Sequence, residues 1–373
     1  MPHRSLGKAT EKMKEAKTGP FEEILPLINQ GKVIPIISNS FCIEPIFADE
    51  EEITDEIDEK PDFDDEDLTI DEQLTKEWAK FIEYPMPDSH NLARVAQYHL
   101  VEEKDNPYLA RKKYVDFIKG LLLNYLGDNE EYKDRISQLK LEAKVRNFSD
   151  IVNDLDLPKF PEKVENPLRL LARLKLPIYV TTSYYDFLER AIEAEGMMPR
   201  TQICFWSEEI TDARPEHHLD NEFVPSPGTP MVYHLYGLED YPKTLVLSED
   251  DYIRFLISVL SHTDKLNPLV PSSLVQKLVE SKLLLLGYQL KDWDFRALFR
   301  FLSEVRKGVN KGLERGMVIQ FNQSRKAELG DESKTIEYLR AYFNQENFEV
   351  QWRNVDTFVR ELWNEWNRDR EGE

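Results

Sequence analysis

The chain has 373 residues, of which 41% are hydrophobic, so it is long enough to bury a sizeable core. Its 70 acidic and 48 basic side chains give a formal net charge of −22, which argues against nucleic acids and anionic membranes as partners, because both are bound through Lys and Arg. Two cysteines cannot build a four-thiolate zinc site, and no apolar run approaches the ~20 residues of a membrane helix, so we expect a cytoplasmic protein without a structural metal.

The first elements follow a polar N-terminal tail, residues 1–20. Apolar residues at helical spacing across 21–30 predict a short helix. Val33–Ile37 is then a continuous apolar run, which is typical of a parallel strand buried on both faces. We therefore assign residues 21–47 to the first part of a sheet-containing domain.

An acidic segment, residues 48–73, comes next. Between Asp49 and Glu72, 15 of 24 residues are Asp or Glu, and only Lys60 opposes them. Like charges at this density repel one another, so we expect a solvated, flexible segment. The alternative is an acidic tether for a basic partner or for cations.

Residues 74–174 have helical spacing almost throughout, which predicts a helical cap inserted after the first strand. Short apolar runs then alternate with helical segments up to residue 366, before a short tail, 367–373. The later predicted strands are Ile178–Thr182, Met231–Leu235, Leu283–Leu286, Met317–Phe321 and Phe348–Trp352. This alternation predicts an α/β fold: a doubly wound, mainly parallel Rossmann-like sheet formed by residues 21–47 and 175–366.

Polar residues cluster where the predicted strands end. Ligands of open α/β sheets bind outside the carboxyl ends of the strands, which is where a cap after the first strand would lie. We therefore expect one pocket there, lined by Ser38, Asn39, Ser40, Ser183, His234 and Tyr236, with Asp186 and Gly287 near its rim.

Two motifs carry a family resemblance. Leu-Val-Leu-Ser-Glu-Asp-Asp-Tyr at 245–252 and Leu-Gly-Tyr-Xaa-Leu-Xaa-Asp at 286–292, together with the helical insertion, resemble the bacterial sirtuin-like domain family. Members of that family include NAD-hydrolysing effectors of antiphage defence. The resemblance covers residues 33–366. It implies NAD or an ADP-ribose-type nucleotide as substrate or ligand, and a homo-oligomer or a protein partner from a defence operon.

The resemblance also assigns site residues. It implies that a nucleotide is bound by Ser38, Asn39, Ser40, Thr182, Gly287 and Tyr288, and that Ser183, Asp186, His234 and Tyr236 are the working residues. Three positions depart from the family pattern: its Gly-Ala-Gly, its NAD-positioning Asn and its catalytic His are here Ser38-Asn39-Ser40, Ser183 and Tyr236.

His234 offers a possible replacement for the missing base. It lies two residues before Tyr236, and residues i and i+2 of a strand share a face, so its imidazole could reach the same cleft. The alternative is a hydrogen-bonded histidine of the core.

Three functions stay open at this point. The first is an NAD hydrolase that cleaves the nicotinamide–ribose bond; protein deacylation is disfavoured because deacylating members generally carry a four-cysteine zinc module. The second is a catalytically inactive sirtuin-like subunit that binds a nucleotide or holds an assembly together. The third is a structural subunit without a ligand.

Overall fold

The computed structural model describes residues 21–371 except for 48–67, 104–105, 128, 130, 162–163, 208–209, 211–222, 262–269, 290–291, 308–313 and 321–331. Its centre is a sheet in the order β3-β4-β2-β1-β5-β6-β7, in which every neighbouring pair is parallel. The strands are β1 (Val33–Ile37), β2 (Ile178–Thr181), β3 (Arg200–Ile203), β4 (Met231–His234), β5 (Lys282–Tyr288), β6 (Gly316–Gln320) and β7 (Phe348–Trp352). The predicted parallel α/β sheet is confirmed.

The central strands that the sequence predicts are buried on both faces of the sheet. All residues of β1, β2, β4 and β5 are buried, because helices cover both sides of the sheet. The covering helices are α1 (Leu25–Asn29), α2 (Asn39–Phe47), α8 (Pro167–Arg173), α9 (Phe187–Ala194), α11 (Glu249–Ser261), α12 (Ser272–Glu280), α13 (Trp293–Arg306), α14 (Glu332–Gln345) and α15 (Val355–Glu371). Among them α8 packs against α9 and α15, and α13 against α11 and α12.

Strand β3 was not predicted. It lies at one edge of the sheet, where it pairs with β4 alone. Arg200 is exposed and Thr201 half-buried, so this strand needs few apolar residues and carries no hydrophobic run. An edge strand of this kind leaves no periodic signal in the sequence.

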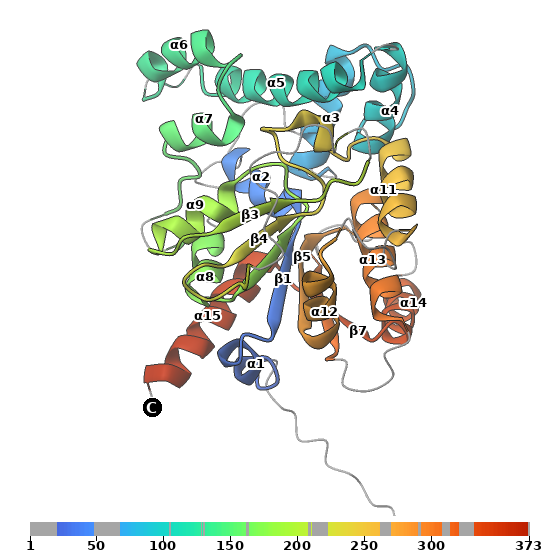
Figure 1. Cartoon of the computed structure of the whole chain (residues 1–373). Coiled ribbons are helices and arrows are strands. Elements are labelled where there is room, and N and C mark those ends of the chain that lie inside the picture. The colour runs from blue at the N-terminus through green and yellow to red at the C-terminus, as the bar shows by residue number, and fades with distance from the viewer. Residues whose placement is uncertain are drawn as a thin grey trace, which may run out of the picture.

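The helical cap lies at one end of the sheet, above β3 and β4 in Figure 1. It consists of α3 (Ile70–Phe81), α4 (Leu92–Glu102), α5 (Pro107–Tyr125), α6 (Lys133–Glu142) and α7 (Phe148–Asp154). Helix α3 begins with a capping box in which Thr69 and Glu72 bond each other's backbone N–H groups. The end of the acidic segment is therefore helical, whereas residues 48–67 lie outside the described residues.

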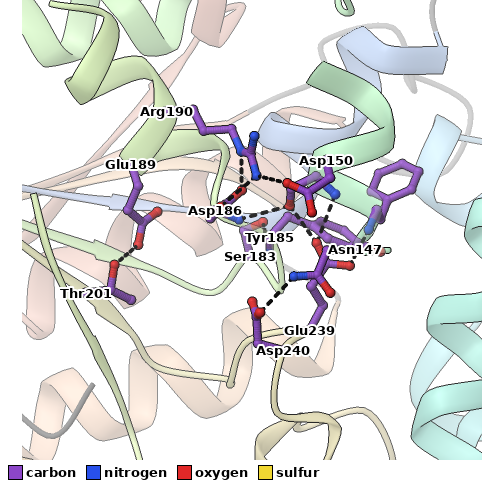
Figure 2. A network of polar contacts seen from close by, with 12 residues as sticks. Asn147, Asp150, Ser183, Tyr185, Asp186, Glu189, Arg190, Thr201, Glu239 and Asp240 are labelled. Atoms are coloured by element: carbon purple, nitrogen blue, oxygen red, sulfur yellow. Dashed lines mark hydrogen bonds and ion pairs between the residues drawn. The ribbon is translucent and has the colours of Figure 1, made fainter. Parts of the chain in front are cut away.

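A buried carboxylate attaches the cap to the sheet (Figure 2). Glu239, in the loop after β4, accepts hydrogen bonds from the backbone N–H groups of Phe148 (2.6 Å) and Ser149 (2.9 Å) at the start of α7. The hydroxyl of Ser149 donates to the same carboxylate at 2.6 Å. An anion at a helix N-terminus is favourable because the first N–H groups have no partner within the helix.

A second, ionic attachment lies deeper in the cap. The guanidinium of Arg111 in α5 contacts the carboxylate of Asp251 in α11 at 2.6 Å, and both side chains are buried. Two buried polar contacts thus hold α5 against α11 and α7 against the loop that follows β4.

The attachment at Glu239 predicts a pH-dependent stability. Burial raises the pKa of Glu239 to about 7, although the hydrogen bonds from Ser149 oppose this. A carboxyl group whose pKa is higher in the folded than in the unfolded chain stabilises the fold at pH values below its unfolded pKa. This contribution is lost as the pH rises through 7. Between pH 5 and 8 the free energy of unfolding, measured in urea, should therefore fall by up to roughly 3 kcal/mol more in the wild type than in Glu239→Gln. Asp240→Asn, at the exposed neighbouring carboxylate, should keep the wild-type pH slope; equal slopes for wild type and Glu239→Gln would contradict the assignment.

Candidate functional site

A pocket of about 220 Å³ opens between the sheet and the cap, at the carboxyl ends of the central strands. Strand addition reverses direction between β1 and β5, so this is the switch point at which open α/β sheets bind ligands. The sheet side contributes Asn39 and Tyr236, the cap contributes Asp71 and His90, and α13 contributes Asp294. A pocket thus lies at the predicted place under the cap, but of the six residues predicted to line it only Asn39 and Tyr236 do so.

The cap places a carboxylate against the start of α2. Asp71, in the first turn of α3, accepts a hydrogen bond from the hydroxyl of Ser40 at 3.2 Å and a long one from the amide of Asn39 at 3.5 Å. Burial raises the pKa of Asp71 to about 6, although the Ser40 hydroxyl acts to lower it. The donors that follow β1 are thus directed at an internal anion.

A second acidic side chain lines the pocket from α13. Burial, together with the charge of Asp71, raises the pKa of Asp294 to about 7, although the backbone N–H of Phe295 donates to its carboxylate at 2.5 Å. The hydroxyl of Tyr236 donates to the backbone carbonyl of Asp294 at 2.6 Å. Tyr236 thus stands where the resemblance implies a catalytic histidine, and its hydroxyl proton is already used in a hydrogen bond.

The loop after β1 is packed tightly against β5. The hydroxyl of Ser38 donates to the carbonyl of Gly287 at 2.7 Å and accepts from the backbone N–H of Phe41 at 3.1 Å, so Ser38 caps α2. Gly287 has φ +79° and marks a register shift in the pairing of β5 with β6. A Cβ at Gly287 would lie 2.5 Å from the Ser38 oxygen and 2.7 Å from the Phe41 Cβ. Neither Ser38 nor Gly287 lines the pocket.

This packing predicts that position 287 tolerates no side chain. Gly287→Ala should lower the free energy of unfolding by about 2 kcal/mol or more, because both the positive φ and the contact with Ser38 oppose a Cβ. Gly120→Ala is the control: Gly120 lies within α5 with open space around its Cα, so alanine there should be neutral or stabilising. Denaturant unfolding measures both, and equal effects would show that the close approach at Gly287 carries no energy.

His234 does not reach the pocket. Strand β4 ends at His234, so Tyr236 lies in the following turn and the alternation of strand faces does not extend to it. The imidazole is fully buried; its Nε2 lies 2.8 Å from the carboxylate of Glu189 and its Nδ1 3.0 Å from the carbonyl of Ser183. Burial acts to lower the pKa of His234, but the charge and hydrogen bond of Glu189 raise it overall. This is the geometry of a core ion pair.

The ion pair predicts a loss of stability when one partner is removed. His234→Ala should lower the free energy of unfolding, measured with denaturant, by about 3–5 kcal/mol, because the buried charge of Glu189 then has no counter-ion. Replacing both partners, His234→Leu with Glu189→Leu, should recover most of that loss, since apolar pairs of similar volume often substitute for buried ion pairs. A mild effect of His234→Ala on unfolding would argue against the ion pair.

The other expected site residues lie in three different places. Thr182 lines the pocket, and its hydroxyl is 3.0 Å from that of the fully buried Tyr288. Ser183 lies beneath the pocket, where its hydroxyl donates to Asn39 at 3.4 Å. Asp186 points to the other side, where it pairs with Arg190 at 2.6 Å (Figure 2).

A larger cavity of about 500 Å³ lies on the side of Asp186, between α2, α7, α8 and α9. Arg190 and Cys42 contribute to its lining. Cys42 and the second cysteine, Cys204, are free and buried, and burial raises the pKa of each thiol to about 12. The cavity contains none of the predicted pocket residues.

Asp71 and Asp294 were missed as pocket residues. In the sequence Asp71 belongs to the acidic segment, and Asp294 lies in the first turn of a helix, where it is expected to be a cap. The one available signal was the capping box at Thr69, which starts a helix inside the acidic run and so gives Asp71 a fixed place.

The described part of the chain contains neither a metal-ligand cluster nor a membrane span. There, no group of three or more His, Cys, Asp or Glu side chains is arranged to hold a metal ion. No described helix combines the length and the apolar character needed to cross a bilayer.

Comparison with known proteins agrees with this architecture. Residues 177–349 match the family described as SIR2-like domain. NAD(+) hydrolase ThsA of Bacillus cereus is 25% identical over 166 residues, which is 44% of this chain and 30% of that protein. The matched part thus spans about a third of the relative. The sirtuin-like resemblance inferred from the motifs is confirmed, and the family match covers β2 to β6 and the first two residues of β7.

Proposed function

We propose that this chain is a sirtuin-like module that binds an NAD-type ligand in the pocket under the cap and does not cleave it by imidazole chemistry. One observation carries the proposal. At the position of the family's catalytic histidine, Tyr236 donates its proton to the carbonyl of Asp294, and the neighbouring His234 is held in the core by Glu189. A general base must reach the proton it removes and be able to accept it. Tyr236 lines the pocket, but burial raises the pKa of its phenol and keeps it protonated, and His234 does not line the pocket.

The remaining lining supports binding. The pocket retains hydrogen-bonding groups at three strand ends, in Asn39, Thr182 and Tyr236, and it lies at the switch point of the sheet. The homologous region of the Bacillus cereus relative belongs to a protein named as an NAD(+) hydrolase, which supports an NAD-type ligand.

Hydrolysis of NAD is the second candidate, and one observation favours it. Asp71 and Asp294 line the same pocket, with pKa values of about 6 and 7. The nicotinamide–ribose bond breaks through an oxocarbenium-like state, and paired carboxyl groups with different pKa values can stabilise such a state and activate water. In this case Asp294 takes the role that the resemblance gives to histidine.

Calorimetry and product analysis on the full chain separate these functions. We expect an NAD-type ligand, either NAD or its nicotinamide nucleoside, to bind with no release of nicotinamide, as measured by isothermal titration and by chromatography of the same samples. Nicotinamide release that falls at least 10²-fold in Asp294→Asn would establish the hydrolase instead. An Asp134→Asn variant, altered at an exposed carboxylate on α6, controls for loss of charge alone. Absence of both binding and release would contradict both functions and favour a structural subunit.

The resemblance also extends to assembly. We propose that the chain acts with copies of itself or with a protein partner encoded in a defence operon. Light scattering of the purified chain, alone and with the products of neighbouring genes, tests this, and a monomer under all conditions would contradict it.

A further inference from the structure

A carboxylate of the protein itself contacts the side chains at the start of α2, near the phosphate position of an open α/β sheet. In such sheets the first N–H groups after β1 bind the phosphate of a nucleotide. Here the carboxylate of Asp71 lies beside that position, where it accepts from two side chains of the first turn of α2: the hydroxyl of Ser40 at 3.2 Å and the side-chain amide of Asn39 at 3.5 Å. A diphosphate would have to displace Asp71 or lie beside its charge.

The charges around the pocket reinforce this arrangement. Among its lining residues in the described part of the chain there is no Lys or Arg, whereas four are acidic: Asp71, Glu72, Asp292 and Asp294. Two arginines of the cap are paired with carboxylates outside the pocket lining. Arg94 pairs with Asp88 and Glu249, and Arg111 pairs with Asp251. The described lining therefore offers no cation to a ligand with two negative phosphates.

The remaining lining suits a flat cation. Tyr252 and Trp293 line the pocket with rings almost parallel to each other, at 15° and a centroid distance of 6.5 Å, and Tyr236 packs edge-on against Tyr252 at 5.3 Å. Aromatic faces attract cations, and they do so more strongly where water is excluded. Carboxylates and aromatic rings in one cavity form the recognition chemistry of an organic cation.

The size of the pocket points to a small ligand. Its volume of about 220 Å³ is below the roughly 300–1,000 Å³ that sites for drug-sized molecules enclose. A complete dinucleotide, with two nucleosides and a diphosphate, exceeds it, whereas one nucleoside is of suitable size.

We propose that the pocket binds a pyridinium nucleoside without phosphates, a flat aromatic cation on an uncharged sugar, and that Asp71 is the residue that selects it over dinucleotides. This inference rests on the proposed function, since it concerns the same pocket and the cationic end of an NAD-type ligand. In it Asp71 has two effects, because the same charge that attracts the pyridinium ring repels a diphosphate at the start of α2.

Isothermal titration of the full chain at pH 8 with four ligands tests the proposal. The ligands are nicotinamide riboside, its uncharged dihydro form, NAD and ADP-ribose. We expect nicotinamide riboside to bind at least tenfold more tightly than each of the other three. The dihydro form is the matched control, since it differs from the riboside chiefly in the charge of the ring.

Asp71→Asn tests the selecting residue. Asparagine keeps an oxygen that can accept from Ser40 but removes the charge, so the variant should bind the riboside at least tenfold more weakly and ADP-ribose more tightly. Asp134→Asn, on α6, should change neither affinity. Melting temperatures verify folding, and if Asp71→Asn does not fold, Asp294→Asn provides the same comparison for the riboside.

The outcomes separate this inference from the proposed function. Binding of NAD or ADP-ribose as tight as that of the riboside overturns the inference and leaves the proposed function in place. Equal affinity for the riboside and its dihydro form also overturns it. So does a change of the riboside and ADP-ribose affinities in the same direction in Asp71→Asn. If none of the four ligands binds, the proposed function falls as well.

Discussion

The parallel pairing of β1 with β5 is the constraint on which the rest of this structure depends. The ladder runs from Val33 opposite Lys282 to Ile37 opposite Leu286, so the two strands end side by side. Across the sheet, β2, β4 and β3 follow β1 on one side, and β6 and β7 follow β5 on the other. The loops at this junction therefore diverge, and the space between them is covered by the cap.

The acidity of the chain is partly a structural device. Carboxylates from one element lie at the first turn of another: Asp71 of α3 contacts the start of α2, and Glu239 accepts from the first N–H groups of α7. Each satisfies donors that would otherwise be buried without partners, and each links two segments far apart in sequence. The cost is desolvation of the charge, which raises the pKa of both groups. At the pocket this arrangement fixes the sign of the local potential and hence the class of ligand.

Much of the fold could be predicted because its central strands are buried on both faces and so appear as continuous apolar runs. β1 was predicted with its observed bounds, and β2, β4 and β5 within a few residues. The place of the pocket followed from the topology rule for parallel sheets. β3 could not be predicted, since only Ile203 of its four residues is apolar, whereas the other edge strand, β7, alternates apolar and polar residues.

The interior of the site was harder to predict, because side-chain direction depends on partners that the sequence does not reveal. His234 had a suitable position along the strand, but Glu189 of α9 lies opposite it and binds its imidazole. Ser38, in place of a glycine, is accommodated by capping α2 and by packing on Gly287. Asp71 acquires its role from a contact between the cap and the sheet. Such contacts arise from long-range packing, which local patterns do not encode.

The two cysteines have a practical consequence. Both thiols are buried and almost fully protonated at neutral pH, and alkylating reagents react with thiolates. The native chain is therefore close to a cysteine-free background for site-specific labelling, so that one cysteine introduced on the cap would carry a fluorophore alone. Cys42 lies in α2 beside the cap, and Cys204 lies just beyond the edge strand β3. The slow modification of each thiol would report how often its own region of the protein opens to solvent.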